Sequence, residues 1–148
     1  MITAIYPGTY DPVTFGHLDV IRRAAGVFDR LVVGVVSNPQ HKRPMFTLDE
    51  RVGFLREALT DTDNVEVDVF AELVVDFARR WDARVIVKGL RVISDFEWEF
   101  QMNQLNRTLA PDGLLVYETG AREELQVQGL STHTSRTYGS ARLTLFRH

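Results

Sequence analysis

With 148 residues and a formal net charge of −3, the chain has the size of one globular domain and lacks the positive charge of a general nucleic-acid binder. It contains no cysteine, which excludes a disulfide framework and thiol catalysis. Because no apolar run approaches the roughly 18 residues of a membrane span, and no signal-peptide layout is recognisable, we expect a cytoplasmic enzyme or binding module.

Strand-like and helix-like segments alternate along most of the chain. Apolar and β-branched runs predict strands at residues 2–5, 31–36, 65–69, 84–87 and 114–117. Helical spacing of apolar residues, with capping signals, predicts helices at 18–28, 47–59, 73–81 and 96–109. This order predicts an α/β fold, a Rossmann-like doubly wound five-stranded parallel sheet flanked by helices. In such sheets ligands bind beyond the carboxyl ends of the strands, where the strand order reverses.

The segment Tyr6 to His17, after the first predicted strand, carries the strongest functional signal. Gly8 and Gly16 would let backbone N–H groups approach a ligand, and a helix N-terminus favours anions. A threonine hydroxyl and His17 add donors suited to phosphate oxygens. The order Thr14-Phe15-Gly16-His17 matches the T/H-x-G-H signature of nucleotidylyl transferases. The alternative is an ordinary strand-to-helix turn with a surface histidine.

Basic residues follow two other predicted strands. Lys42 and Arg43 lie in the loop after the second strand, and Lys88-Gly89-Leu90-Arg91 follows the fourth directly. Since the fold rule brings these loops near the first one, the basic groups are placed to surround several phosphates. For Arg43, simple solvation is the competing interpretation.

Several blocks in one order resemble the phosphopantetheine adenylyltransferases, a bacterial family within the T/H-x-G-H superfamily. The resemblance runs from Ala4 to about Leu109 and is lost after about residue 117. Its blocks are Tyr6-Pro7-Gly8-Thr9-Tyr10-Asp11-Pro12, Thr14 to His17, Pro44 to Arg51, Lys88 to Arg91, and Asp95-Phe96-Glu97-Trp98-Glu99. It implies transfer of AMP from ATP to 4′-phosphopantetheine, giving dephospho-CoA and pyrophosphate in coenzyme A synthesis. Mg²⁺ bound mainly through the ATP phosphates, and a homo-oligomer, specifically a hexamer, are implied as well.

The resemblance also implies roles for individual residues. His17 would bind ATP and stabilise the pentacoordinate transition state, with Lys42 and Arg91 as further catalytic residues. The residues implied for phosphopantetheine are Thr9, Lys42, Val74 and Lys88. The residues implied for ATP are Thr9, Tyr10, His17, Gly89, Leu90, Arg91, Glu99, Ser131 and Thr132. No residue is implied as a metal ligand.

Some positions leave alternatives open. The loop before Pro44 is one residue longer than the common family pattern, so His41 or Arg43 are alternatives to Lys42. Lys88 stands where many relatives have arginine, and lysine cannot form a bidentate fork with phosphate. Asp11 either fixes its turn through an Asx bond or has a magnesium-linked role.

The end of the chain departs from the family pattern. We therefore divide the sequence into a nucleotidylyl transferase domain at 1–118 and a divergent C-terminal tail of the same domain at 119–148. The tail is either a degenerate ATP-phosphate loop, offering Ser131, Thr132 and Arg136, or the product of a shifted reading frame. We favour the second account, which predicts a disordered tail and weakened ATP binding. The transfer implied by the resemblance stays the first hypothesis, and a member that binds nucleotide or coenzyme A but no longer turns over is the second. A relative that uses another phosphorylated acceptor, such as glycerol phosphate, is a third hypothesis.

Overall fold

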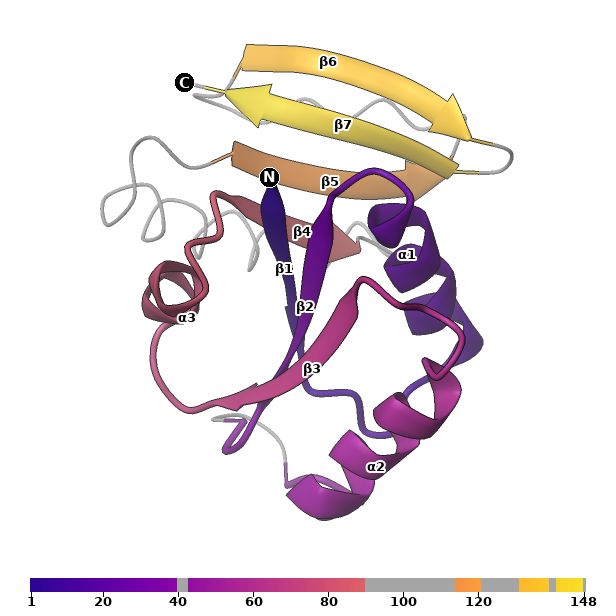
Figure 1. Ribbon diagram of the computed structural model, residues 1–148, viewed down its shortest axis with the longest axis vertical. Helices are drawn as coiled ribbons and strands as arrows, with labels where there is room; N and C mark the ends of the chain where they lie inside the picture. The colour runs from indigo at the N-terminus through magenta and orange to yellow at the C-terminus, as the bar shows by residue number, and fades with distance from the viewer. Residues whose placement is uncertain (40–42, 90–113, 121–130, 139–140, 148) are drawn as a thin grey trace.

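The computed structural model describes residues 1–39, 43–89, 114–120, 131–138 and 141–147 (Figure 1). The predicted helix at 96–109 lies outside the described residues. So do four residues implied for the site, which are Lys42, Leu90, Arg91 and Glu99.

Within the described residues, one sheet of seven strands forms the centre of the molecule, in the order β3-β2-β1-β4-β5-β7-β6. Four parallel pairings join β3 (Val65–Phe70), β2 (Arg30–Val36), β1 (Thr3–Gly8), β4 (Val85–Gly89) and β5 (Leu114–Gly120). The sheet continues with antiparallel β7 (Ala141–Arg147) and β6 (Ser131–Tyr138). The predicted parallel sheet with flanking helices is confirmed as the fold class.

The predicted size of the sheet is wrong, because two segments of the expected tail pair beside β5 (Figure 1). Their sequences, STHTSRTY and ARLTLFR, are rich in threonine, which fits a pleated strand better than a helix. The expectation of a disordered tail therefore does not describe these two strands, and β5 itself runs across the predicted boundary at residue 118.

Helices cover both faces of the parallel strands (Figure 1). One apolar cluster joins the sheet to α1 (Phe15–Ala25) and α2 (Leu48–Ala58), and a second joins it to α3 (Val74–Arg80). Among the described residues, no helix is long and apolar enough to cross a membrane.

The strand β2 shows why the sheet is buried on both sides. Leu31 and Val33 belong to the first apolar cluster, whereas Val32 belongs to the second. Gly34 also faces the second cluster, and a Cβ atom at this position would clash with the ring of Phe77 on α3. The continuous apolar run thus forms a strand covered on both faces, as the sequence predicted.

The first loop is shorter than predicted. β1 continues through Pro7 to Gly8, and α1 already begins at Phe15. Proline is tolerated in this strand because the β1–β4 pairing ends at Ile5, so that Pro7 is paired only with β2. The segment that carries the functional signal therefore consists of the end of a strand, a tight loop and the first turn of a helix.

Candidate active site

The carboxyl ends of β1 and β4 lie next to each other at the point where the strand order reverses. β1 pairs in parallel with β2 on one side and with β4 on the other, with Ile5 opposite Ile86. Thr9 follows β1 directly, whereas Lys88 and Gly89 end β4. The sheet therefore brings the first loop and the end of β4 together, as the sequence predicted, at the place where doubly wound sheets bind ligands.

His17 is held in a defined orientation by the capping box of α1. The Thr14 side chain accepts a hydrogen bond from the His17 backbone N–H at 3.4 Å, and the Thr14 N–H donates to His17 Nδ1 at 3.1 Å. Because Nδ1 acts as an acceptor, the neutral imidazole carries its proton on Nε2. His17 thus offers an N–H donor from the N-terminal turn of a helix, which itself favours anions.

Tyr10 is a buried support for His17. Its ring contacts the imidazole edge to face, with 5.1 Å between ring centroids, and only 2% of the residue is exposed. Its hydroxyl donates to the Tyr6 carbonyl at 2.7 Å, and burial raises the pKa of the phenol well above its usual value, so it stays a neutral donor. The backbone has a φ of 50°, a left-handed conformation that packing and this bond maintain.

A glycine is needed at position 8 because the Tyr10 ring packs against it, and the sequence did not indicate this contact. A Cβ atom at position 8 would lie 3.0 Å from Cε2 and Cζ of the Tyr10 ring. The predicted reason for this glycine was close approach of a ligand to the backbone. The structure supplies a different one, namely the space that the tyrosine ring occupies.

Asp11 joins the first loop to the segment that precedes α2. Its two carboxylate oxygens accept hydrogen bonds from the Met45 and Phe46 N–H groups at 2.7 and 2.8 Å. These bonds, together with the positive charge of Arg51, hold the pKa of the carboxyl below its usual value. The carboxylate makes these long-range bonds in place of the predicted Asx bond within its own turn. It connects positions 34 and 35 residues apart, and it anchors the chain just beyond the loop that contains Lys42.

Arg51 on α2 was missed as a site residue. Its guanidinium is buried and donates to the backbone carbonyl of Thr9 and to two carbonyls at the end of β2. A signal was present in the sequence, because Arg51 occupies a position between Leu48 and Leu55 at the spacing of an apolar helical stripe. A charged residue in such a stripe indicates a buried cation with specific partners.

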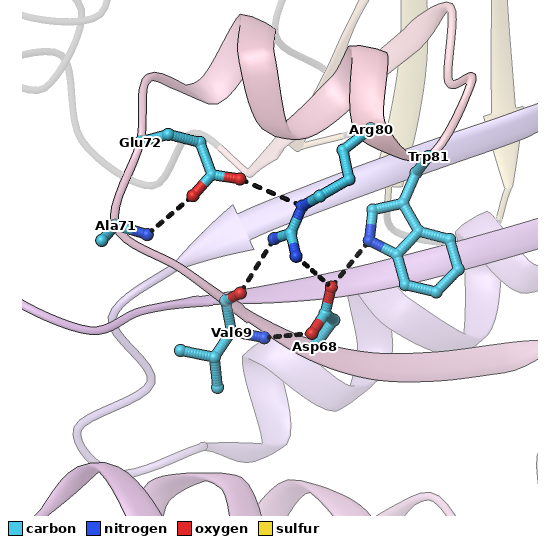
Figure 2. Close-up of polar contacts among 6 residues, drawn as sticks. All are labelled: Asp68, Val69, Ala71, Glu72, Arg80 and Trp81. Atoms are coloured by element: carbon cyan, nitrogen blue, oxygen red, sulfur yellow. Dashed lines mark hydrogen bonds and ion pairs between the residues drawn. The ribbon is translucent and has the colours of Figure 1, made fainter.

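Val74, implied for the pantetheine arm, is the first residue of α3 and is half-buried. A polar network holds this helix on the end of β3 (Figure 2). Arg80 donates to the Val69 carbonyl at 2.9 Å and pairs with Glu72 at 3.1 Å and Asp68 at 3.4 Å. The network therefore fixes both ends of the short connection that leads to Val74.

The structure does not bring Ser131 and Thr132 to the edge formed by Gly8 and Gly89. Thr132 is paired with Phe146, which is paired with Leu115, and these lie level with Ile86 within β4. Two strands, β5 and β7, also separate β6 from β4. Of the polar residues proposed in the tail, Arg136 is the one level with Gly89, through Leu143 and Glu118.

Among the described residues, no group of three or more His, Cys, Asp or Glu side chains is placed to hold a metal ion. Asp11, the acidic residue of the first loop, accepts hydrogen bonds from backbone N–H groups with both carboxylate oxygens. Arg43 is exposed, and His41 and Lys42 lie outside the described residues.

Comparisons with known proteins show the family to which the chain is similar. The family model described as cytidylyltransferase-like matches residues 5–136. A phosphopantetheine adenylyltransferase of Janthinobacterium sp. (strain Marseille) is 48% identical over 94% of this chain and 86% of its own length. One from Cupriavidus metallidurans is 56% identical over 76% of this chain and 69% of its own. The fold is also similar to that of a bifunctional NMN adenylyltransferase/ADP ribose pyrophosphatase from Francisella tularensis, solved with AMP and manganese. That likeness has a TM-score of 0.53, 16% identity, and coverage of 73% of this chain and 35% of the other.

Proposed function

The chain belongs to the phosphopantetheine adenylyltransferase family, and we propose that it transfers the adenylyl group of ATP to 4′-phosphopantetheine, giving dephospho-CoA and pyrophosphate. It is a nucleotidyltransferase of coenzyme A synthesis. The structural observation that carries the proposal is the juxtaposition of the first loop and the end of β4 at the switch point of the sheet. Nothing in the comparisons favours the impaired member considered from the sequence.

The proposed chemistry is an in-line displacement at the α-phosphorus of ATP. An oxygen of the acceptor phosphate forms the new P–O bond while the bond to the bridging oxygen breaks, and pyrophosphate leaves with that electron pair. The acceptor is already ionised, so the protein needs no nucleophile or strong base. Its contribution is to position two anions and to stabilise the charge on the transferring group.

Within this proposal, His17 stabilises the transition state through Nε2–H. Support comes from the capping box, which makes Nδ1 an acceptor and leaves the proton on the other nitrogen. Thr9 and Lys88 hold the acceptor phosphate from two adjacent strand ends, and Gly89 lies at the ATP phosphates. Lys42, Leu90, Arg91 and Glu99 keep the roles implied by the family, whereas Ser131 and Thr132 are left out because of their place in the sheet.

The proposal also includes Mg²⁺, a cytoplasmic location and assembly into a homo-oligomer, in the family a hexamer. Mg²⁺ would be bound mainly through the ATP phosphates, as the family resemblance implies. There it would neutralise charge on the polyphosphate. Sedimentation of the purified chain would test the hexamer directly.

The reaction is tested by measuring pyrophosphate release from ATP and Mg²⁺ with phosphopantetheine, with glycerol 3-phosphate, and with no acceptor. We expect release with phosphopantetheine alone. For His17→Ala we expect kcat to fall by about 10²–10³, the loss typical of one transition-state donor, with a much smaller change in the KM for ATP. His17→Gln keeps an N–H near the Nε2 position and should retain more activity. Equal losses in kcat and ATP affinity would reduce His17 to a binding residue, and an inactive wild-type chain that still binds coenzyme A would overturn the function.

A further inference from the structure

We propose that Arg51 is a positioning residue that holds Thr9 and the end of β2 in the arrangement that the two phosphates require. The inference rests on the proposed function. Arg51 does not belong to the loop itself. It lies on α2, 42 residues further along the chain than Thr9. Its guanidinium contacts the backbone of the loop at the Thr9 carbonyl.

The contacts of Arg51 join two strand ends. One nitrogen, Nη1, donates to the Thr9 carbonyl at 2.8 Å and to the Val36 carbonyl at 2.9 Å. The other, Nη2, donates to the Ser37 carbonyl at 3.3 Å. Thr9 follows β1 and Ser37 follows β2, so a single planar group sets the separation of the two loops. Lysine cannot reproduce this arrangement, because its donors radiate from one atom.

The burial of Arg51 indicates that more than stability is involved. Only 1% of the residue is exposed, and its partners are neutral carbonyls. Within the described part of the chain, its Nε has no hydrogen-bond partner. Burying a cation without a bonded carboxylate is unfavourable compared with an apolar residue at the same stripe position. An arginine here is explained if its fixed geometry and its positive charge serve the proposed anion site at the first loop.

The link to catalysis is through the backbone of Thr9. Because the Thr9 carbonyl is fixed, the position of its side chain follows. Asp11, two residues further on, binds the Met45 and Phe46 amides, and its carboxylate is stabilised by the Arg51 charge. Loss of the guanidinium would therefore release the loop at Thr9 and weaken its second attachment.

Three variants test this inference. Arg51→Met removes the donors and the charge at similar volume, and Arg51→Lys keeps the charge without the fork. The matched control is Leu55→Ala, one helical turn further along α2, where the side chain is fully buried in the core and lies outside the site. We expect Arg51→Met to lower kcat at saturating substrates by about 100-fold, as a displacement near 1 Å does. Arg51→Lys should recover part of it, and Leu55→Ala should keep the wild-type kcat although it is less stable.

A second measurement does not depend on turnover. We expect backbone amide exchange in the peptide covering residues 5–17 to be faster in Arg51→Met than in the wild type, and unchanged in Leu55→Ala. If the wild type is inactive but the variants show this exchange pattern, the proposed function is contradicted and the positioning role of Arg51 is not. If Arg51→Met does not fold, Arg51→Lys decides. A wild-type kcat in the lysine variant, or an equal loss in Leu55→Ala, would overturn the positioning role.

Discussion

Replacing Gly8 with alanine tests the support that holds His17. The added Cβ would lie 3.0 Å from Cε2 and Cζ of Tyr10 and 3.3 Å from its hydroxyl oxygen. Ordinary van der Waals contact begins at 3.4 Å, so the ring must retreat by at least 0.4 Å (3.4 minus 3.0). Tyr10 is buried, and its hydroxyl is bonded to the Tyr6 carbonyl at 2.7 Å, so there is little space for this movement.

The expected magnitude follows from overpacking and from the hydroxyl bond. Adding a methyl group to a packed core destabilises a protein by about 1–3 kcal/mol. The strain is either retained as overpacking or relieved by loss of the buried Tyr10–Tyr6 bond, which costs a similar amount of about 1–3 kcal/mol, so we expect Gly8→Ala to cost about 2 kcal/mol. Because the Tyr10 ring contacts the His17 imidazole, we also expect kcat to fall roughly tenfold, less than for a full 1 Å displacement.

Gly53→Ala is the matched control, since the chemical change is identical. Position 53 lies within α2, and an added Cβ there has no atom within 4 Å. Helix propensity alone predicts that this variant gains up to about 1 kcal/mol. Urea unfolding and steady-state kinetics of both variants provide the assay. A Gly8→Ala variant as stable as the wild type would refute the packing argument, and lost stability with an unchanged kcat would refute the role of Tyr10 in placing His17.

Two further predictions concern the same loop. Thr14→Ala removes the hydroxyl that caps α1 and should cost about 1 kcal/mol, whereas Thr14→Ser should stay close to the wild type in thermal unfolding; equal losses would show that the hydroxyl is not the reason. Asp11→Asn should be less stable than the wild type at pH 7, because the lowered pKa of Asp11 in the folded state makes its contribution present above the unfolded pKa. That difference, followed by urea midpoints, should shrink as the pH falls below about 4, the ordinary carboxyl value, towards the folded pKa, and a difference independent of pH would contradict the assignment.

The sequence was sufficient where structure depends on neighbours along the chain. The run of residues 31–36 predicted a doubly covered strand, and the Thr47–Glu50 spacing predicted a capping box that the structure contains. The neighbouring positions of β1 and β4, whose ends carry the first loop and Lys88, followed from the rule for parallel sheets. In each case the signal is periodic or lies within one helical turn, so no long-range packing was needed to interpret it.

The sequence was insufficient where a side chain has a distant partner. Asp11 accepts from backbone amides 34 and 35 residues away, and Arg51 donates to a carbonyl 42 residues away. Every residue type offers the same backbone groups, so the sequence does not show which residues these side chains bond, and neither set of partners was predicted. The strands β6 and β7 were missed for another reason. β7 pairs with β5 and β6 pairs with β7, and the polar sequence of the tail does not indicate these partners.

These ties should matter more for turnover than for stability, because the proposed reaction depends on positioning. A single hydrogen bond such as that from Arg51 to Thr9 contributes about 1–3 kcal/mol to folding when one group is charged. Displacing a reacting group by 1 Å lowers the rate by about 100-fold, which corresponds to about 2.7 kcal/mol in the barrier. His17, in the first turn of α1, and Thr9, directly after β1, are proposed to touch the phosphates, and each has a supporting residue: Tyr10 for His17, and Arg51 for Thr9. Variants of these supporting residues should therefore spread more widely in kcat than in unfolding free energy, and the opposite ranking would mean that the loops adjust freely to the bound substrates.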